Sequence, residues 1–188
     1  MKVDEENESL SVTVYYANGY GNAKNCLYPY SGTSSDPEEL KALFGHDHTF
    51  IEFKDNYRCI DNFIKAIIAA LDNDNDHSDN PNDWVYIPDI PKLFPGVPCI
   101  ISTSRHHMKQ KGDKGPRPRY HVMLLTNTIT SPEEYTALLT KVQKHFPKKN
   151  PSTTSMVQMT EVSTKPAVLG LLRNPVWNCA ISIWSLLR

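Results

Sequence analysis

An acidic run directly follows an apolar stretch in the middle of the chain, and this junction constrains the fold most strongly. Residues 66–71 read AIIAAL, and residues 72–79 read DNDNDHSD, with four aspartates and no Lys or Arg. Periodicity leaves two alternatives for the apolar stretch, because it fits either a helix over residues 60–71 or a short buried strand. On the second alternative, the strand delivers the aspartates at its end.

A basic stretch follows some 25 residues after the acidic run. Residues 104–122 contain six Lys or Arg, three His and a single Asp. The Lys, Gly and Pro content of residues 105–119 predicts an exposed and mobile loop. Acidic clusters suit hard divalent cations, and basic clusters suit phosphates. The two stretches together indicate metal-dependent chemistry on nucleotides or nucleic acid.

Composition sets the class of protein. A length of 188 residues fits one domain, or two tightly joined modules, with a real core. The net charge of −1 gives no global argument for nucleic-acid binding, so the basic stretch must carry that argument alone. The four cysteines have no CxxC spacing, which argues against a zinc knuckle or a redox motif. With no signal peptide and no apolar stretch of roughly 20 residues, we expect a cytoplasmic protein without a membrane span.

Local signals predict alternating strands and helices. Asp36 or Ser35 can cap a helix that has Pro37 in its first turn, and Ser131 opens a capping box with Pro132 at the first helical position. Apolar and β-branched runs predict strands over 11–16, 49–53, 97–103 and 120–125. A short helix is expected over 88–94 and a longer one over 131–145. Residues 1–9 are polar, and we expect them to fray.

The acidic run allows three interpretations. If it ends a strand, Asp72 and Asp74 point the same way and can hold one or two Mg²⁺ ions for attack on phosphate. It also fits a solvated Asp/Asn turn. The third alternative is a calcium loop, but His77 stands where glycine makes the sharp turn and Pro81 lies where a helix should begin.

Several segments of the chain, taken together, resemble one family. These are the acidic run, residues 83–85 (DWV), 94–97 (FPGV), 104–109 (SRHHMK) and 117–122 (RPRYHV). They resemble primase-like replication proteins of the archaeo-eukaryotic primase superfamily, common in phages and integrative elements. The resemblance covers roughly residues 10–147. It implies an α/β (α+β) core of two packed modules around a central cleft, with residues 66–72 forming a strand.

The resemblance also implies roles for individual residues. Asp72 and Asp74 would hold Mg²⁺ or Mn²⁺ beside a catalytic His121. The phosphates of a nucleoside triphosphate or of DNA would be bound by basic side chains, namely Arg105, Lys109, Lys114, Arg117 and Arg119. The implied reaction is template-directed nucleotide addition on single-stranded or primed DNA, with a helicase as a possible further partner.

The chain departs from the family pattern after residue 147. Family members carry a third acidic residue on a later strand, whereas Glu161 is the only acid after Glu134 and its surroundings do not match. We therefore expect a divergent segment over 148–188, an incomplete core and weak or absent polymerase activity. Two rival functions remain open. One is an inactive remnant that still binds nucleotide or DNA, and the other is a metal-dependent phosphoesterase or nuclease.

Overall fold

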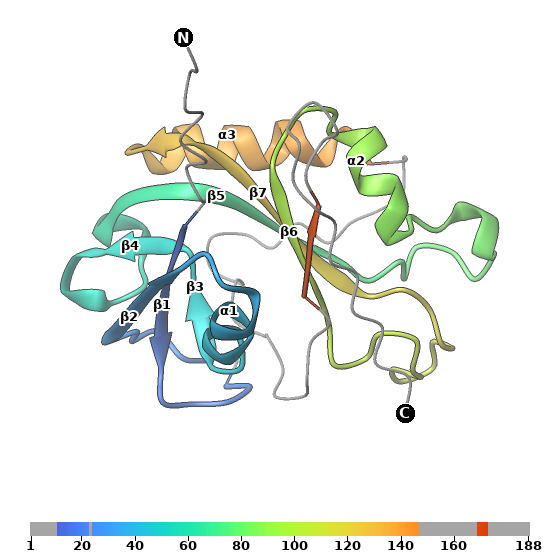
Figure 1. The fold of residues 1–188 in the computed structure, drawn as a ribbon, viewed down its shortest axis with the longest axis horizontal. Helices are drawn as coiled ribbons and strands as arrows, with labels where there is room; N and C mark the ends of the chain where they lie inside the picture. The colour runs from blue at the N-terminus through green and yellow to red at the C-terminus, as the bar shows by residue number, and fades with distance from the viewer. Residues whose placement is uncertain (1–10, 23, 147–168, 173–188) are drawn as a thin grey trace, which may run out of the picture.

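The described residues form two antiparallel sheets and three α-helices, which is an α+β fold (Figure 1). The computed structural model describes residues 11–22, 24–146 and 169–172. The small sheet has the strand order β2-β1-β3, and the large sheet has the order β4-β5-β7-β6-β8. The strands are β1 Val12–Ala17, β2 Tyr30–Ser34, β3 Asp47–Thr49, β4 Ile51–Phe53, β5 Phe63–Asn73, β6 Cys99–Thr103, β7 Tyr120–Ile129 and β8 Leu169–Leu172. The helices are α1 Pro37–Phe44, α2 Ile90–Leu93 and α3 Pro132–Gln143.

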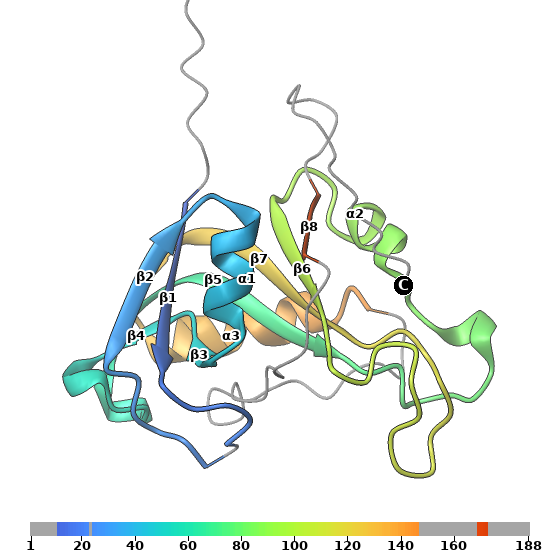
Figure 2. The same ribbon diagram turned by 60° about the horizontal axis from the view of Figure 1, so that its bottom comes forward.

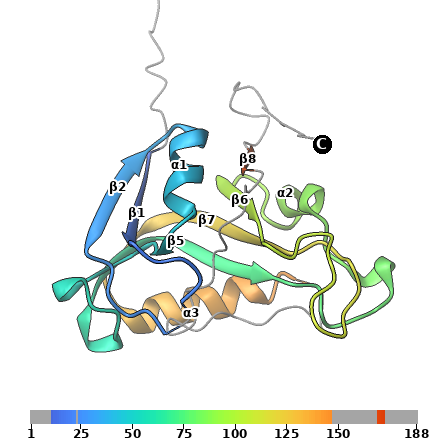
Figure 3. The same cartoon turned by 90° about the horizontal axis from the view of Figure 1, so that it is seen from below.

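The large sheet is covered on both faces (Figure 3). One face packs against α3, and the other packs against the small sheet with α1. Side chains of β5 alternate between these layers, so that Leu71 lies in the core beneath α3 while Ile68 and Ala70 lie in the core beneath the small sheet. A strand that is buried on both faces reads as a continuous apolar run. The strand alternative for residues 66–71 is therefore confirmed, and the helix alternative is wrong.

The helix caps expected from the sequence are present, but some strand and helix boundaries differ from those expected. The Asp36 side chain accepts the N–H groups of Glu38 and Glu39, and Ser131 accepts that of Glu134, as expected for the starts of α1 and α3. The strand expected over 49–53 is instead two strands, because β3 ends before Phe50 and joins the small sheet while β4 joins the large one. The helix expected over 88–94 is a 3₁₀ turn, Ile87–Asp89, followed by the short α2.

The alternation of Asp and Asn in the acidic run has a structural cause. Asn73 and Asn75 are fully buried, whereas Asp72, Asp74 and Asp76 are partly exposed. The Asn75 amide donates to the carbonyls of Val85 (3.0 Å) and Pro118 (2.8 Å), and its oxygen accepts the Val85 N–H (2.9 Å). Asn75 also has a positive φ of 53°, a conformation that Asn tolerates better than most residues. The asparagines thus fasten the run, and the aspartates between and beside them keep some exposed surface.

We expect Asn75→Ala to lower the free energy of unfolding by about 2–4 kcal/mol, because the buried Val85 N–H and Pro118 carbonyl lose the partner that Asn75 provides. Urea unfolding at neutral pH measures this change. The exposed Asn82 provides the matched control, since Asn82→Ala should change stability by less than about 0.5 kcal/mol. Equal effects of the two substitutions would contradict a fastening role for Asn75.

Candidate functional site

A polar row crosses three neighbouring strands of the large sheet. Asp72 on β5 pairs with His121 on β7, which in turn pairs with Ser102 on β6. Directly opposed residues of an antiparallel sheet share one face, and here it is the face beneath the small sheet. The His121 Nδ1 atom lies 3.6 Å from the Asp72 Oδ1 atom. On the outer strand β8, the residue paired with Ser102 is Leu169, so the row does not continue with an acid.

Asp72 is a partly covered carboxylate with few protein partners. Its side chain is 31% exposed. Burial raises the pKa of Asp72, the negative charge of Asp74 raises it further, and the positive charges of His121 and Lys111 oppose both effects. Within the described residues, neither Asp72 Oδ1 nor His121 Nε2 has a hydrogen-bond partner. Both atoms are buried polar atoms whose hydrogen-bonding capacity is left unused by the described residues.

His48 approaches the row from the small sheet. It is buried, its Nδ1 lies 2.9 Å from the His46 carbonyl oxygen, and its ring packs against Phe44 and Phe50. Burial lowers the pKa of His48 to about 4, and the positive charge of the nearby His121 lowers it further. The row therefore lies where the two sheets meet, with residues contributed from both.

Asp74 and Asp76 are held by cations from the basic stretch. Asp74 Oδ2 lies 2.5 Å from Lys111 Nζ, and Asp74 Oδ1 lies 3.7 Å from Arg119 Nε. Asp76 Oδ1 accepts a hydrogen bond of 2.9 Å from Arg119 Nη2. The loops that carry the acidic run and the basic stretch lie side by side at this end of the sheet (Figure 2). The two stretches thus neutralise each other.

Arg119 is a buried residue that holds the backbone of the basic stretch in place through hydrogen bonds. Its side chain has no exposed surface, and its Nη1 donates to the carbonyls of His106 (3.3 Å) and Lys109 (2.8 Å). The expectation of an exposed loop is therefore wrong at this position. A guanidinium this deeply buried needs carboxylate and carbonyl partners to offset its lost hydration. Contact between Arg119 and a nucleotide remains a prediction.

Arg117 has a similar bracing role. It is buried, its Nη1 donates to the carbonyls of Asn75 and Ser78, and its Nη2 donates to Asp79 at 2.8 Å. Its guanidinium also lies 5.3 Å from the centre of the Trp84 ring. The expectation of exposure is wrong here too, because the arginine is needed to join the two loops.

The remaining predicted phosphate ligands lie at the surface of the same stretch. Lys114 lies 3.7 Å from Asp79, which is a long ion pair. Arg105 and Lys109 are exposed, and no ion pair involves either of them within the described part of the chain. These two cations are therefore the members of the predicted set that are available to a phosphate.

The calcium-loop alternative does not fit the structure. Asp72 lies inside β5 rather than after a helix, and a 3₁₀ turn, Pro81–Asp83, occupies the place of an exiting helix. The Asp83 carboxylate accepts a hydrogen bond of 2.6 Å from Ser78. Residues 72–83 are thus a strand end and a braced loop.

Two members of the site escaped the sequence analysis. Ser102 lies in an apolar strand, where one hydroxyl gives no signal. His48 alternates with His46 just before the predicted strand 49–53, and this alternation was a usable sign that the strand begins earlier. Glu161, the late acid considered for the third carboxylate, lies outside the described residues.

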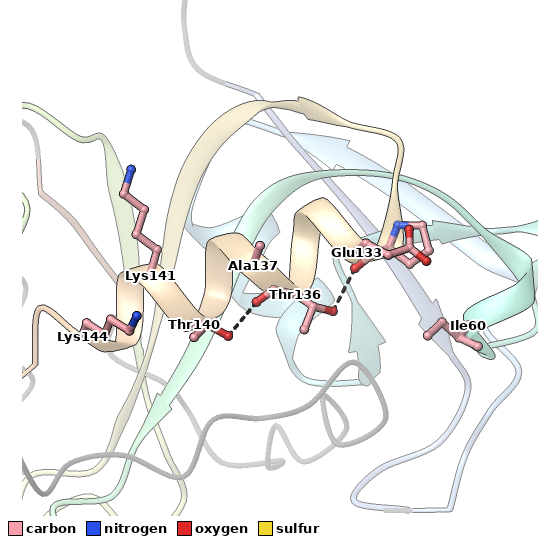
Figure 4. A pocket seen from close by; sticks show the side chains of 8 residues that line it. Ile60, Glu133, Thr136, Ala137, Thr140, Lys141 and Lys144 are labelled. Atoms are coloured by element: carbon pink, nitrogen blue, oxygen red, sulfur yellow. Dashed lines mark hydrogen bonds between the residues drawn. The ribbon is translucent and has the colours of Figure 1, made fainter.

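A groove of about 560 Å³ lies along the outer side of α3 (Figure 4). Its walls include Ile60, Lys141 and Lys144, and its floor includes Thr136 and Thr140, whose hydroxyls donate to carbonyls one turn earlier. Because α3 covers the other face of the large sheet, the groove does not contribute to the polar row.

Comparisons with other proteins found no match to a protein-family model, to a curated protein or to a solved structure. Among the described residues, no group of three or more His, Cys, Asp or Glu is arranged to hold a metal ion. No helix in the described part of the chain is long and apolar enough to cross a membrane. The assignment of function therefore depends on the geometry of the row.

We expect acid to destabilise the protein partly through His48. Its pKa is about 4 in the folded state, below the ordinary 6.5, so the unfolded chain binds more protons between these values. The stabilisation is complete above about pH 6.5 and is lost as pH falls toward 4, by about 2–3 kcal/mol. Urea unfolding at several pH values should show a shallower decline for His48→Gln than for wild type. Parallel declines would contradict the assignment.

Proposed function

We propose that this protein is a primase-polymerase-like replication protein of a mobile element, with metal-dependent nucleotidyl transfer as its reaction. The observation that carries the proposal is the paired row of Asp72 and His121 at the end of β5, with Asp74 close by. The resemblance to the primase superfamily concerns the same residues. A carboxylate pair beside a histidine, under a second module, suits a metal-bound triphosphate.

The donor set fits one Mg²⁺ or Mn²⁺ ion. Asp72 and Asp74 supply carboxylate oxygens, the ligands that hard cations prefer, and Asp72 Oδ1 has no hydrogen-bond partner among the described residues. The metal would offset phosphate charge during attack of a 3′-hydroxyl on the α-phosphate, with pyrophosphate as the leaving group. His121 would contact the triphosphate. Lys111 would have to leave Asp74 and could then face the phosphates.

A second candidate is a nucleotide- or DNA-binding protein without polymerase activity. The observation that favours it is the position next to Ser102 on β8, which is occupied by Leu169 and not by an acid. Two metal ions need a further carboxylate to fix the second one. Under this candidate, binding survives, but nucleotide addition is weak or absent.

We expect Asp72→Asn to abolish Mn²⁺-dependent binding of a nucleoside triphosphate while leaving stability unchanged or slightly raised. The fold raises the pKa of Asp72, so it disfavours the charged form, and an amide removes that cost. Calorimetric titration with and without Mn²⁺ measures binding, and thermal unfolding measures stability. Asp61→Asn, at an exposed carboxylate on the 3₁₀ turn before β5, is the matched control and should bind as wild type does.

Primer extension with Mn²⁺ on the same samples separates the candidates. Elongation supports nucleotidyl transfer, binding without elongation supports the second candidate, and strand degradation indicates a nuclease or phosphoesterase. Wild-type protein that binds no nucleotide in Mn²⁺ would refute the proposal. A large loss of stability in Asp72→Asn would mean that this aspartate is structural.

We expect the exposed cations of the basic stretch to bind DNA phosphates rather than bases. Arg105→Ala with Lys109→Ala should weaken single-stranded DNA binding about equally across sequences and reduce the salt slope by about 1.4, or about 0.7 for each lost contact. Fluorescence anisotropy at several salt concentrations measures both quantities. Lys111 and Lys114 are left intact because both are paired with aspartates.

The control for this pair is Lys54→Ala with Lys144→Ala, at exposed lysines outside the basic stretch. An unchanged slope in the Arg105 and Lys109 variant would show that these side chains only solubilise the surface.

A further inference from the structure

A row of aromatic rings crosses the small sheet and reaches the surface. The ring of Tyr16, at the end of β1, lies 5.5 Å from that of Tyr30 on β2 and 5.1 Å from that of His46. Tyr20 in turn stacks on His46, with ring centres 5.0 Å apart and planes 25° from parallel. The rings at the two ends are the most open, since Tyr20 is 63% exposed and Tyr30 is 45% exposed. We call these four residues the aromatic row.

The aromatic row lies beside the polar row of the candidate site. Tyr16 is paired in register with His48, the residue that approaches His121 from the small sheet. Along β1, Val12 and Val14 belong to the core between the small and the large sheet, and Tyr16 is the next residue on the same face. The aromatic row therefore begins where the apolar contact between the two sheets ends.

The chemistry around the aromatic row favours a polyanionic partner with flat groups. Residues 18–30 contain one charged side chain, Lys24, which is exposed. Asp47, at the start of β3, is buried and accepts the backbone N–H groups of Gly21 and Asn22. Exposed aromatic rings with an exposed lysine in the segment that joins them suit bases and phosphates.

We infer that the aromatic row is a stacking platform for the bases of single-stranded nucleic acid. Tyr20 and Tyr30 offer open ring surfaces, while Tyr16 and His46 hold them in a fixed line. Every base has a flat face, so the platform binds strands with little preference for sequence. The inference rests on the proposed function in one respect: the bound strand would be the template for nucleotide addition.

The decisive experiment compares strands with and without bases. An oligothymidylate of about 12 nucleotides and an abasic strand of the same length carry similar phosphate charge, and only the first can stack. Anisotropy is measured without metal and without nucleotide, so that the Asp72 site does not contribute. Wild-type protein should prefer the strand with bases, and equal affinity for both strands would overturn the inference.

Variants of the two end rings assign the preference to the aromatic row. Tyr20→Leu with Tyr30→Leu keeps apolar bulk but removes the rings, and it should weaken binding of the strand with bases at least 10-fold. Tyr20→Phe with Tyr30→Phe keeps the rings and should bind within about 2-fold of wild type. Tyr57→Leu, at a similarly exposed tyrosine outside the aromatic row, is the matched control.

Unchanged binding by the double leucine variant would overturn the inference. A change in oligomeric state in that variant, seen by sedimentation, would also overturn it, because the aromatic row would then join copies of the chain. The outcome is independent of the proposed function. If wild-type protein binds nucleotide with Mn²⁺ but shows no preference for the strand with bases, only the inference about the rings fails. If it prefers the strand with bases but binds no nucleotide with Mn²⁺, only the proposed function of the Asp72 site fails.

Discussion

The buried guanidinium of Arg119 is the interaction on which the site depends. A fully buried cation is tolerable only when carboxylates and carbonyls replace its hydration, and Asp76, His106 and Lys109 do so here. Arg119 lies two residues before His121, and Asp76 lies four residues after Asp72. The ion pair between the loops therefore fixes the register in which Asp72 and His121 meet. Removing this arginine would take the hydrogen-bonded partner from Asp76 and the donor from the His106 and Lys109 carbonyls, and it would loosen both strand ends together.

The same pairing changes the expected balance of charge in the site. Sequence alone suggests an open acidic cluster for metal and an open basic cluster for phosphate, but most of those charges are already matched. Lys111 is the cation best able to exchange, because its side chain is 44% exposed, whereas that of Arg119 is fully buried. A metal ion at Asp74 would therefore compete with Lys111, at a cost much smaller than displacing a buried arginine. Nucleotide would favour this exchange, since its phosphates give the released lysine a new partner.

Local signals and long-range contacts differ in how well a sequence reveals them. The caps at Asp36 and Ser131 are predictable because each is formed within four residues. The strand at 66–71 is ambiguous locally, and the primase resemblance pointed to the correct alternative. The division of residues 47–53 between two sheets was not predictable, because it depends on pairing with β1 and β5. Burial of Arg117 and Arg119 was missed for the same reason, since their partners lie about 40 residues away.

The candidate site and the aromatic row both lie where the residues that face the layer between the two sheets stop being apolar. Beneath the small sheet, β5 changes from Ile68 and Ala70 to Asp72 along one face, while β1 changes from Val14 to Tyr16. Both changes mark the line where the apolar layer between the two sheets ends. A carboxylate on one side suits a metal ion, and rings on the other suit bases. Since the two sides belong to different sheets, a substitution on one side need not disturb the other, so the two binding activities that we propose would be separable by mutation.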